Sequence, residues 1–283
     1  MTRKAFSGET SGAALLLLLP GALVIVGFLG ALAVTGATSL FDAHGNLSLL
    51  QYWRFLSDSF YLNFLWRSFR TAAYCTPTTL LLGFPFAYVM ARSSTPVRVT
   101  LTVILVVQFF TSYIVRTYAL ILVLGNNGII NRPLINLGII ARPIPLLFHE
   151  AGVAIALIFI PLPFMIFPIY SVLKNIEPNL EVAASSLGAS RMKTFWYVTF
   201  PLSFPGVLAG VVLVFLFDLT AYIMPGMLGG GYFNMIANVI QEQAMAVLDK
   251  RFASAISIVL LIITLLTLYL IHALGSRMKG ASA

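Results

Sequence analysis

Long apolar runs recur along this chain, and they limit its possible folds more than any other feature of the sequence. An α-helix needs about 20 residues to cross the hydrocarbon core of a bilayer. Backbone N–H and C=O groups find no water there, so a crossing segment must be a helix or a strand of a closed barrel. The apolar and polar alternation that a barrel requires is missing from these runs. We therefore predict an all-α membrane protein with six transmembrane helices, at residues 13–34, 69–91, 99–124, 152–173, 202–224 and 252–274.

The composition of the chain excludes an ordinary soluble fold. Of its 283 residues, 59% are hydrophobic and only 9% are charged, whereas about 25% of residues are charged in an average globular protein. The 17 Lys and Arg residues outnumber the 9 Asp and Glu residues, yet they form no dense basic cluster. We therefore expect contacts with the lipid bilayer and its anionic headgroups, and no binding of nucleic acid.

The first apolar run has two interpretations. It follows Arg3 and Lys4 and contains an Ala-Leu-Ala sequence at residues 31–33, as a cleavable secretory signal would. The apolar core of a signal peptide spans only about 7–15 residues, and this run is longer. The run is followed by further membrane segments, so an uncleaved first helix is the better interpretation.

Six crossings place both termini on the same side of the membrane. Cytoplasmic loops usually carry an excess of Lys and Arg. With the termini inside the cell, this rule makes a small majority of the basic residues cytoplasmic. That set is Arg3, Lys4, Arg92, Arg98, Lys174, Arg191, Lys193, Arg277 and Lys279. The prediction is a multi-pass protein of the inner membrane with both termini in the cytoplasm.

An amphipathic stretch separates the fourth and fifth apolar runs, with the sequence EPNLEVAASSLGASRMKTFWYVTFPLSFPG at residues 177–206. Pro178 predicts a helix start, and one helical face carries Leu180, Ala183, Ala184 and Leu187. A face with small residues allows a second protein to approach closely, so we expect this helix to sit in a groove of a partner.

The end of that predicted helix also has recognisable signals. Gly188 can supply the left-handed residue that closes a helix. Ser190 can then cap a second short helix that contains Arg191 and Lys193. Pro201 marks the return of the chain into the bilayer. The stretch is therefore predicted to fold as helix, glycine turn and helix.

In this stretch the chain resembles the type I permeases of binding-protein-dependent ABC importers. Their cytoplasmic signature reads E-A-A, three residues, Gly, nine residues and I-x-L-P, and here Ala183, Ala184, Gly188 and Pro201 occupy that frame. Val182 stands at the family's glutamate position. Glu181 comes one residue earlier, which moves its carboxylate about 100° around a helix.

This resemblance implies a role for the stretch. In the family it forms the coupling helix that docks into the ATPase subunit. The residues carried over as the ATPase-coupling loop are Glu181, Ala183, Ala184, Leu187, Gly188 and Pro201. The shape-dependent roles of the alanines and the glycine carry over directly, whereas the salt-bridge role of the glutamate is open.

Further segments narrow the resemblance to the subfamily that includes spermidine/putrescine permeases of the PotB type. They read SFR at residues 68–70, VRTY at 115–118, GNNGIIN at 125–131, LGG at 228–230 and NVIQ at 238–241. The resemblance implies a polyamine or related small amine as cargo. The implied partners are two ATP-binding cassette ATPase subunits, a second homologous permease and an extracytoplasmic solute-binding protein.

The same resemblance implies three segments in the chain. Residues 1–61 hold an N-terminal tail, the first transmembrane helix and the first external loop. Residues 62–276 form the permease core, with the coupling loop at 174–201. Residues 277–283 form a cytoplasmic C-terminal tail.

The sequence contains no motif for chemistry of its own. Three glycines at 229–231 lack the Lys-Ser/Thr pair of a phosphate-binding loop. His44, His149 and His272 are far apart, Cys75 is the single cysteine, and no GxSxG nucleophile motif is present. We therefore expect no catalytic residue, no metal and no cofactor, and we assign ATP hydrolysis to a separate subunit.

Asp218 is the most informative charged residue in the apolar runs. A charge in the middle of a membrane helix costs about 2.5–3.5 kcal/mol on insertion scales, and such residues often mark a transport pathway. Its carboxylate could attract a cationic substrate, with Tyr222 one turn further on for a cation–π contact. Alternatively, Asp218 is the buried partner of Arg116 or Arg70. The sequence leaves both interpretations open.

Arg116, in the outer part of the third run, also has two interpretations. It could pair with Asp218 or Glu150 as a latch of the pathway, or it could anchor its helix at the headgroups. Ionisable residues and prolines within the runs also allow an ion- or proton-coupled secondary transporter. Six spans without a visible inverted repeat argue against that class. An intramembrane enzyme is a third class, and it lacks a nucleophile, base or metal set.

Overall fold

The computed structural model describes residues 10–42 and 45–280, and all regular elements in those two ranges are helices. Across the same ranges, the strand-type pairing consists of one isolated bridge between Phe41 and Leu47. The all-α prediction is confirmed. Arg3, Lys4 and His44, which entered the predictions above, lie outside the described residues, as do residues 281–283 of the predicted C-terminal tail.

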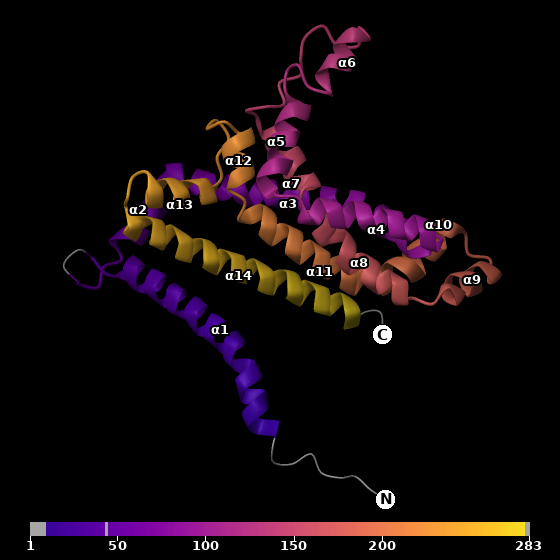
Figure 1. Cartoon of the computed structure of the whole chain (residues 1–283), viewed down its shortest axis with the longest axis horizontal. Coiled ribbons are helices and arrows are strands. Elements are labelled where there is room, and N and C mark those ends of the chain that lie inside the picture. Colours follow the sequence, from indigo (N-terminus) through magenta and orange to yellow (C-terminus); the bar gives the residue numbers. More distant parts are fainter. Residues whose placement is uncertain (1–9, 43–44, 281–283) are drawn as a thin grey trace, which may run out of the picture.

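Three helices form the centre of the molecule: α3 (Ser59–Arg92), α8 (Leu162–Asn175) and α11 (Phe200–Leu219). They run side by side in Figure 1. Each contributes buried apolar side chains to a shared core that excludes lipid from between the helices. This triplet carries the polar residues discussed below.

Two glycines allow α11 to approach α8 at backbone distance. A Cβ atom on Gly206 would lie 2.7 Å from the carbonyl oxygen of Pro168, and one on Gly210 would lie 2.8 Å from Sδ of Met165. Close contacts of this kind are typical of small residues between membrane helices. Any larger side chain at either position would push the two helices apart.

Two long helices lie outside the triplet: α14 (Lys250–Gly280) and α1 (Thr10–Leu40). They pack on each other near the end of α1 and the start of α14, and α1 diverges toward its own start (Figure 1). The short helices α2 (Leu50–Ser57) and α13 (Ile236–Met245) cover that end of the bundle. A buried cluster that includes Phe55 holds them to α3 and α14.

The predicted third span is broken. Residues 99–124 were expected to form one helix, but the chain folds as α4 (Thr95–Phe110) and α5 (Tyr113–Leu124), bent by 103°. Thr111 and Ser112 between them have extended backbone with ψ of 135°. The hydroxyl of Thr111 donates to the carbonyl of Val107 at 2.6 Å, so the polar pair satisfies the end of α4 locally.

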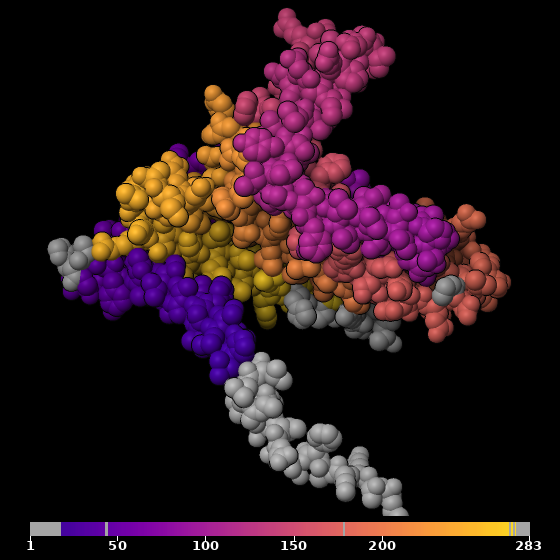
Figure 2. All heavy atoms as spheres, viewed as in Figure 1, coloured from indigo at the N-terminus to yellow at the C-terminus, as the bar shows by residue number. Residues whose placement is uncertain are grey.

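After the bend, the chain projects from the bundle as an arm at residues 113–149, which Figure 2 shows protruding from the rest of the molecule. The arm holds α5 and α6 (Asn131–Asn136), and α7 (Glu150–Phe159) returns from it to pack against α3. Buried Asn131 organises its loop, because its amide donates to the carbonyls of Gly125 and Ile144, both at 3.1 Å.

The predicted count of six membrane crossings is not confirmed by length and composition. Four helical segments are long and apolar enough to cross a bilayer: Leu18–Leu40, Glu150–Asn175, Arg191–Leu219 and Lys250–Ile271. The bent pair α4 and α5 gives a fifth if it counts as one span. Helix α3, the predicted second crossing, is long enough, but its threonines and other polar residues lower its hydropathy, and several of them are buried against other helices. The described residues therefore do not confirm the count of six.

At the far end from α2 and α13, three short elements join α8 to α11. They are α9 (Pro178–Ser186), α10 (Arg191–Thr194) and the π-helix η1 (Phe195–Thr199), which runs directly into α11. In Figure 1, α9 extends beyond the ends of the long helices.

Candidate functional site

The predicted helix, glycine turn and helix are present at the predicted residues. Helix α9 begins at Pro178 and ends at Ser186, and Gly188 follows with a left-handed φ of +84°. Oγ of Ser190 accepts a hydrogen bond from the N–H of Lys193 at 3.4 Å, as an N-cap of α10 should. The backbone prediction for this loop is confirmed.

Helix α9 exposes apolar side chains at the end of the molecule. Leu187 is 89% exposed, Val182 and Leu180 are also exposed, and Ala183 leaves a flat surface between them. Ala184 is partly buried on the inner side. A group of exposed apolar residues on a loop outside the membrane-spanning helices is typical of a protein-binding surface.

Glu181 does not belong to that exposed surface. Its carboxylate accepts hydrogen bonds from Nη2 of Arg92 at 2.8 Å and from Oγ1 of Thr199 at 3.0 Å. The hydroxyl of Tyr88 donates to it at 3.4 Å. The side chains of Arg92 and Glu181 are only 18% and 20% exposed. The sequence left open whether Glu181 has the salt-bridge role of the family's glutamate. In the structure its side chain faces the membrane helices of its own chain.

A cavity of about 740 Å³ lies behind α9, and Glu181 forms part of its wall. Tyr88, Ser185, Phe195 and Thr199 also line it. Helix α9 also contacts α10 and η1 beside this cavity. Among the side-chain hydrogen bonds of α9 in the described part of the chain, those of Glu181 are the ones that reach α3 and η1.

Asp218 is fully buried in the last turn of α11. The hydroxyl of Thr76, on α3, donates to its Oδ2 at 3.5 Å. Within the described part of the chain, Oδ1 has no hydrogen-bond partner. An ionisable group that is buried with so few partners is costly, which fits a functional role better than a structural one.

The arginines that could have neutralised Asp218 are used elsewhere. Nη2 of Arg70 pairs with Glu150 at 2.6 Å. Nη1 of Arg116 donates to the carbonyl of Ile160 at 3.4 Å, and its guanidinium lies over the ring of Tyr113. Neither of the two pairings that the sequence allowed for Asp218 is formed.

Tyr222 does not lie one helical turn beyond Asp218, and this part of the prediction is wrong. Helix α11 ends at Leu219, and Thr220 bonds back through its hydroxyl to the carbonyl of Leu216 at 2.8 Å. Tyr222 precedes the next helix, α12 (Ile223–Leu228), and its carbonyl accepts from the amide of Asn238 at 2.7 Å. The residue is 44% exposed.

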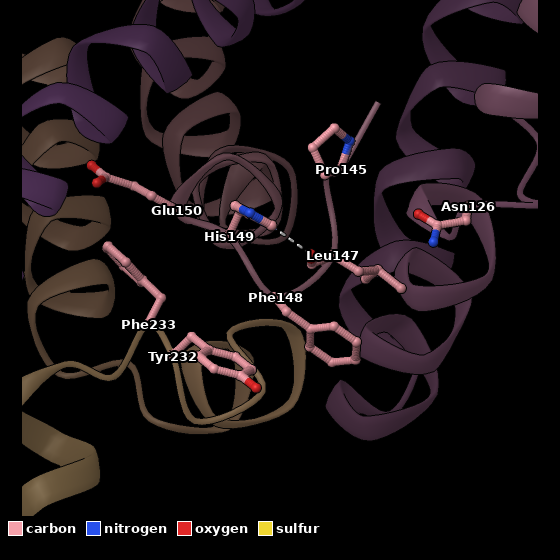
Figure 3. Close-up of a pocket in the computed structure, with 8 residues that line it drawn as sticks. All are labelled: Asn126, Pro145, Leu147, Phe148, His149, Glu150, Tyr232 and Phe233. Carbon is pink, nitrogen blue, oxygen red and sulfur yellow. Dashed lines mark hydrogen bonds between the residues drawn. The ribbon is translucent and has the colours of Figure 1, made fainter. Parts of the chain in front are cut away.

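A second cavity, of about 610 Å³, lies where the arm meets the segment after α12, and no sequence pattern indicated it. Figure 3 shows Glu150 and the rings of Phe148, Tyr232 and Phe233 around it. Glu150 also accepts from the hydroxyl of Tyr74 at 2.9 Å. A carboxylate beside aromatic rings is a combination that suits an ammonium group.

An unusual backbone conformation shapes this cavity. Phe148 has a positive φ of 63°, and its N–H donates to the carbonyl of Leu228 at 2.7 Å. Its ring lies against Gly230, where a Cβ atom would overlap the ring carbons. In the sequence, the three glycines at 229–231 were the only sign of a close contact here, and they did not indicate that Phe148 would make it.

The chain matches known proteins along most of its length. Residues 80–280 match the profile of a family described as binding-protein-dependent transport system inner membrane component. The spermidine/putrescine transport system permease protein PotB of Escherichia coli (strain K12) is 36% identical over 248 residues, covering 86% of this chain and 90% of that protein. PotB of Salmonella typhi is 37% identical over 223 residues, covering 79% and 77%.

The fold also matches a solved structure. A crystal structure of a bacterial ABC transporter involved in the import of the acidic polysaccharide alginate has a chain that superposes with a TM-score of 0.74. The match covers 95% of this chain and 96% of that chain at 16% identity. At that identity the likeness concerns the fold.

Proposed function

Because the chain belongs to the family of inner membrane components of binding-protein-dependent transport systems, we propose that it is the permease subunit of an ATP-driven importer of polyamines. The observation that carries this proposal is the 36% identity to PotB of Escherichia coli over nine tenths of that protein's length. Members of this family are the non-catalytic membrane subunits of such importers. No observation favours an ion- or proton-coupled carrier.

The partners follow from the family and from the two ends of the molecule. Two ATP-binding cassette subunits would supply ATP hydrolysis, and one of them would receive the exposed face of α9. A second homologous permease would complete the pathway. An extracytoplasmic solute-binding protein would deliver the cargo at the opposite end, near α13 and the arm.

The proposed orientation has α9 in the cytoplasm together with both termini. Gly275, near the end of α14, packs on Leu208 in the first half of α11, so the C-terminal end of α14 lies toward the α9 side. Helix α1 meets the start of α14 near its own end, where the hydroxyls of Ser39 and Tyr52 bond at 2.7 Å. Its start therefore points to the α9 side. In this orientation residues 62–276 are the permease core, with the coupling loop at 174–201.

Transport requires two arrangements of the helices, one open to each side. To shift such an equilibrium from 1:99 to 99:1, a ligand must favour one state by about 5.5 kcal/mol. ATP binding to the partner would supply this difference, and Ala183, Ala184 and Gly188 would pass it to the membrane helices through close backbone contact. Pro201 marks the point where the chain re-enters the bilayer.

Two acidic groups lie where a cationic cargo would need them. Glu150 and its neighbouring rings form the entrance cavity, and Asp218 is a buried carboxylate deeper in the bundle. We assign Asp218 to the pathway and Arg116 to a wall of it, with Tyr222 at its outer end. An ammonium group of the cargo would replace the missing partner of Asp218 in another arrangement of the helices.

The test is uptake of radiolabelled spermidine into proteoliposomes that contain this chain, the second permease and the ATPase subunits, with binding protein outside. The expected result is uptake that requires ATP inside the vesicles and binding protein outside. Uptake by this chain alone, driven by an ion gradient without ATP, would overturn the proposal. ATP-dependent uptake of another solute, with none of spermidine or putrescine, would reject the cargo and keep the transporter class.

A further inference from the structure

Glu181 connects α9 to two different membrane helices. Arg92 is the last residue of α3, and Tyr88 lies one turn earlier on the same helix. Thr199 is the last residue of η1 and precedes α11 directly. A single carboxylate therefore bridges three elements, with its two oxygens shared among three donors.

The connection extends to a fourth element through the same arginine. Nη1 of Arg92 donates to the carbonyl of Ile176 at 3.2 Å, at the end of α8 where the chain turns toward α9. The guanidinium thus holds the start of the coupling loop with one nitrogen and Glu181 with the other. Planar guanidinium groups suit such simultaneous contacts, because their donors are fixed in direction.

The π-helix η1, which carries Thr199, is itself packed firmly against α3. The N–H of Phe200 bonds to the carbonyl of Phe195, five residues back, which widens the turn. Both rings lie on Phe84 of α3, with centroids 5.4 Å and 5.8 Å from it. This aromatic packing holds η1 against α3. A movement of α9 that is transmitted through Glu181 should therefore move η1 and the end of α3 together. Wide turns of this kind are frequent at functional sites.

The two helices that Glu181 holds are the same two that meet at Asp218. Thr76 on α3 bonds to Asp218 on α11. With a rise of about 1.5 Å per residue, Thr76 lies about 24 Å along α3 from Arg92, and Asp218 lies about 28 Å along α11 from Thr199. A displacement of α9 that is transmitted through Glu181 would reach both sides of this buried pair.

We propose that Glu181 is the positioning residue that joins α9 to α3 and α11, so that movement of α9 shifts both helices at Asp218. Exposed Val182 occupies the position at which the family pattern has a glutamate. The acid of this chain, Glu181, instead bonds to its own helix α3 and to η1. The consequence for transport rests on the proposed function, whereas the connection of α9 to the helices does not.

The first experiment uses this chain alone in lipid nanodiscs, without ATPase subunits. Hydrogen exchange of the backbone amides of residues 178–190 is compared between wild type and Glu181→Gln. We expect about tenfold faster exchange in the variant, which corresponds to about 1.4 kcal/mol. The matched control is Glu177→Gln, which removes an exposed acid from the same loop and should leave exchange unchanged. Equal exchange in wild type and Glu181→Gln would overturn the proposal.

The second experiment uses the assembled importer and measures solute molecules transported per ATP hydrolysed. Glu181→Gln should lower this ratio about tenfold, while co-purification with the ATPase and the rate of ATP hydrolysis stay within about twofold. A purely structural role would lower assembly, hydrolysis and transport together. The double variant Arg92→Glu/Glu181→Arg restores an ion pair and should recover part of the ratio. An unchanged ratio in Glu181→Gln would overturn the proposal.

Thr199→Val serves as a milder variant if Glu181→Gln fails to fold. It removes one donor to Glu181 and keeps the shape of the side chain, so it should shift exchange and coupling in the same direction by a smaller factor. No shift in either measurement would count against the proposal. If wild type binds no ATPase, the proposed function fails, and the exchange experiment still decides whether Glu181 holds α9.

Discussion

The region around Glu181 and the region around Asp218 place a carboxylate in opposite surroundings. Glu181 accepts three hydrogen bonds, one of them from an arginine, and remains about one fifth exposed. Asp218 is fully buried, with one long hydrogen bond, and its other oxygen has no partner among residues 10–42 and 45–280. A well-partnered acid stabilises one arrangement of helices, whereas a poorly partnered buried acid does not. The first region is therefore suited to transmit movement and the second to respond to it.

The largest effect is expected at Asp218. Asp218→Asn removes the carboxylate and keeps the shape, so spermidine uptake should fall about 100-fold, which corresponds to about 2.8 kcal/mol. The midpoint of thermal unfolding should not fall, because the buried oxygen had few partners to lose. Asp249→Asn, which removes a partly exposed acid that is paired with Arg54, is the control and should keep uptake within about twofold. A loss of stability with normal uptake would make Asp218 structural and end the contrast with Glu181.

The next effect concerns the close packing of α11 on α8, between the two regions. Gly206→Ala places a Cβ atom 2.7 Å from the carbonyl oxygen of Pro168, so it should lower the free energy of unfolding by about 1–3 kcal/mol. Gly36→Ala in α1 is the control, because nothing lies within 4 Å of its Cβ position. Hydrogen exchange of α9 should be unchanged in both variants, since Glu181 keeps its partners. Faster exchange of α9 in Gly206→Ala would show that the packing of α11 on α8, and not Glu181 alone, holds α9 in place.

A smaller effect is expected on the exposed side of α9. Gly188→Asp forces a side chain into a left-handed conformation, which costs about 1–2 kcal/mol, and places a charge on the docking face. The helices should still assemble, but the number of solute molecules transported per ATP hydrolysed should fall about tenfold. Gly138→Asp is a matched control, because Gly138 also has a positive φ and open space around it. Normal transport by Gly188→Asp would remove the coupling role from this loop.

The smallest effect is expected at the third acid of the series, Glu150. Its partner Arg70 is 48% exposed, and exposed ion pairs contribute about 0–1 kcal/mol. Arg70→Gln should therefore change the free energy of unfolding by less than about 1 kcal/mol, while it frees Glu150 for a cationic cargo. The concentration of binding protein and spermidine that gives half-maximal uptake should fall. A rise in that concentration would mean that the pair itself shapes the entrance.

Local signals were sufficient to predict the fold of the loop between α8 and α11. A proline start, a glycine with positive φ and a serine cap each act within a few residues, so α9, Gly188 and α10 were found in place. The burial of Asp218 could also be predicted, because an acid in the middle of an apolar run must lie among apolar side chains or lipid.

The tertiary contacts could not be read in the same way. Arg92 and Thr199 are remote from Glu181 in sequence, and no local pattern indicates that an acid turned by about 100° would meet them. The bend at Thr111 and Ser112 was missed because two small polar residues scarcely interrupt an apolar run. The helix that carries Asp218 was extended to Tyr222 because the run continues in composition although the backbone turns at Thr220.

Cysteine labelling and cross-linking can decide whether α9 faces the cytoplasm and binds a nucleotide-hydrolysing partner. Leu187→Cys, in a Cys75→Ala background, is cross-linked in membranes that contain the assembled importer, with Leu137→Cys on the arm as the control. Position 187 should react with impermeant maleimides only from the cytoplasmic side, and should form a cross-link to the ATPase subunit that changes when ATP is added. Labelling from the external side would contradict the cytoplasmic location of α9, and the lack of a cross-link would contradict its binding to the ATPase subunit.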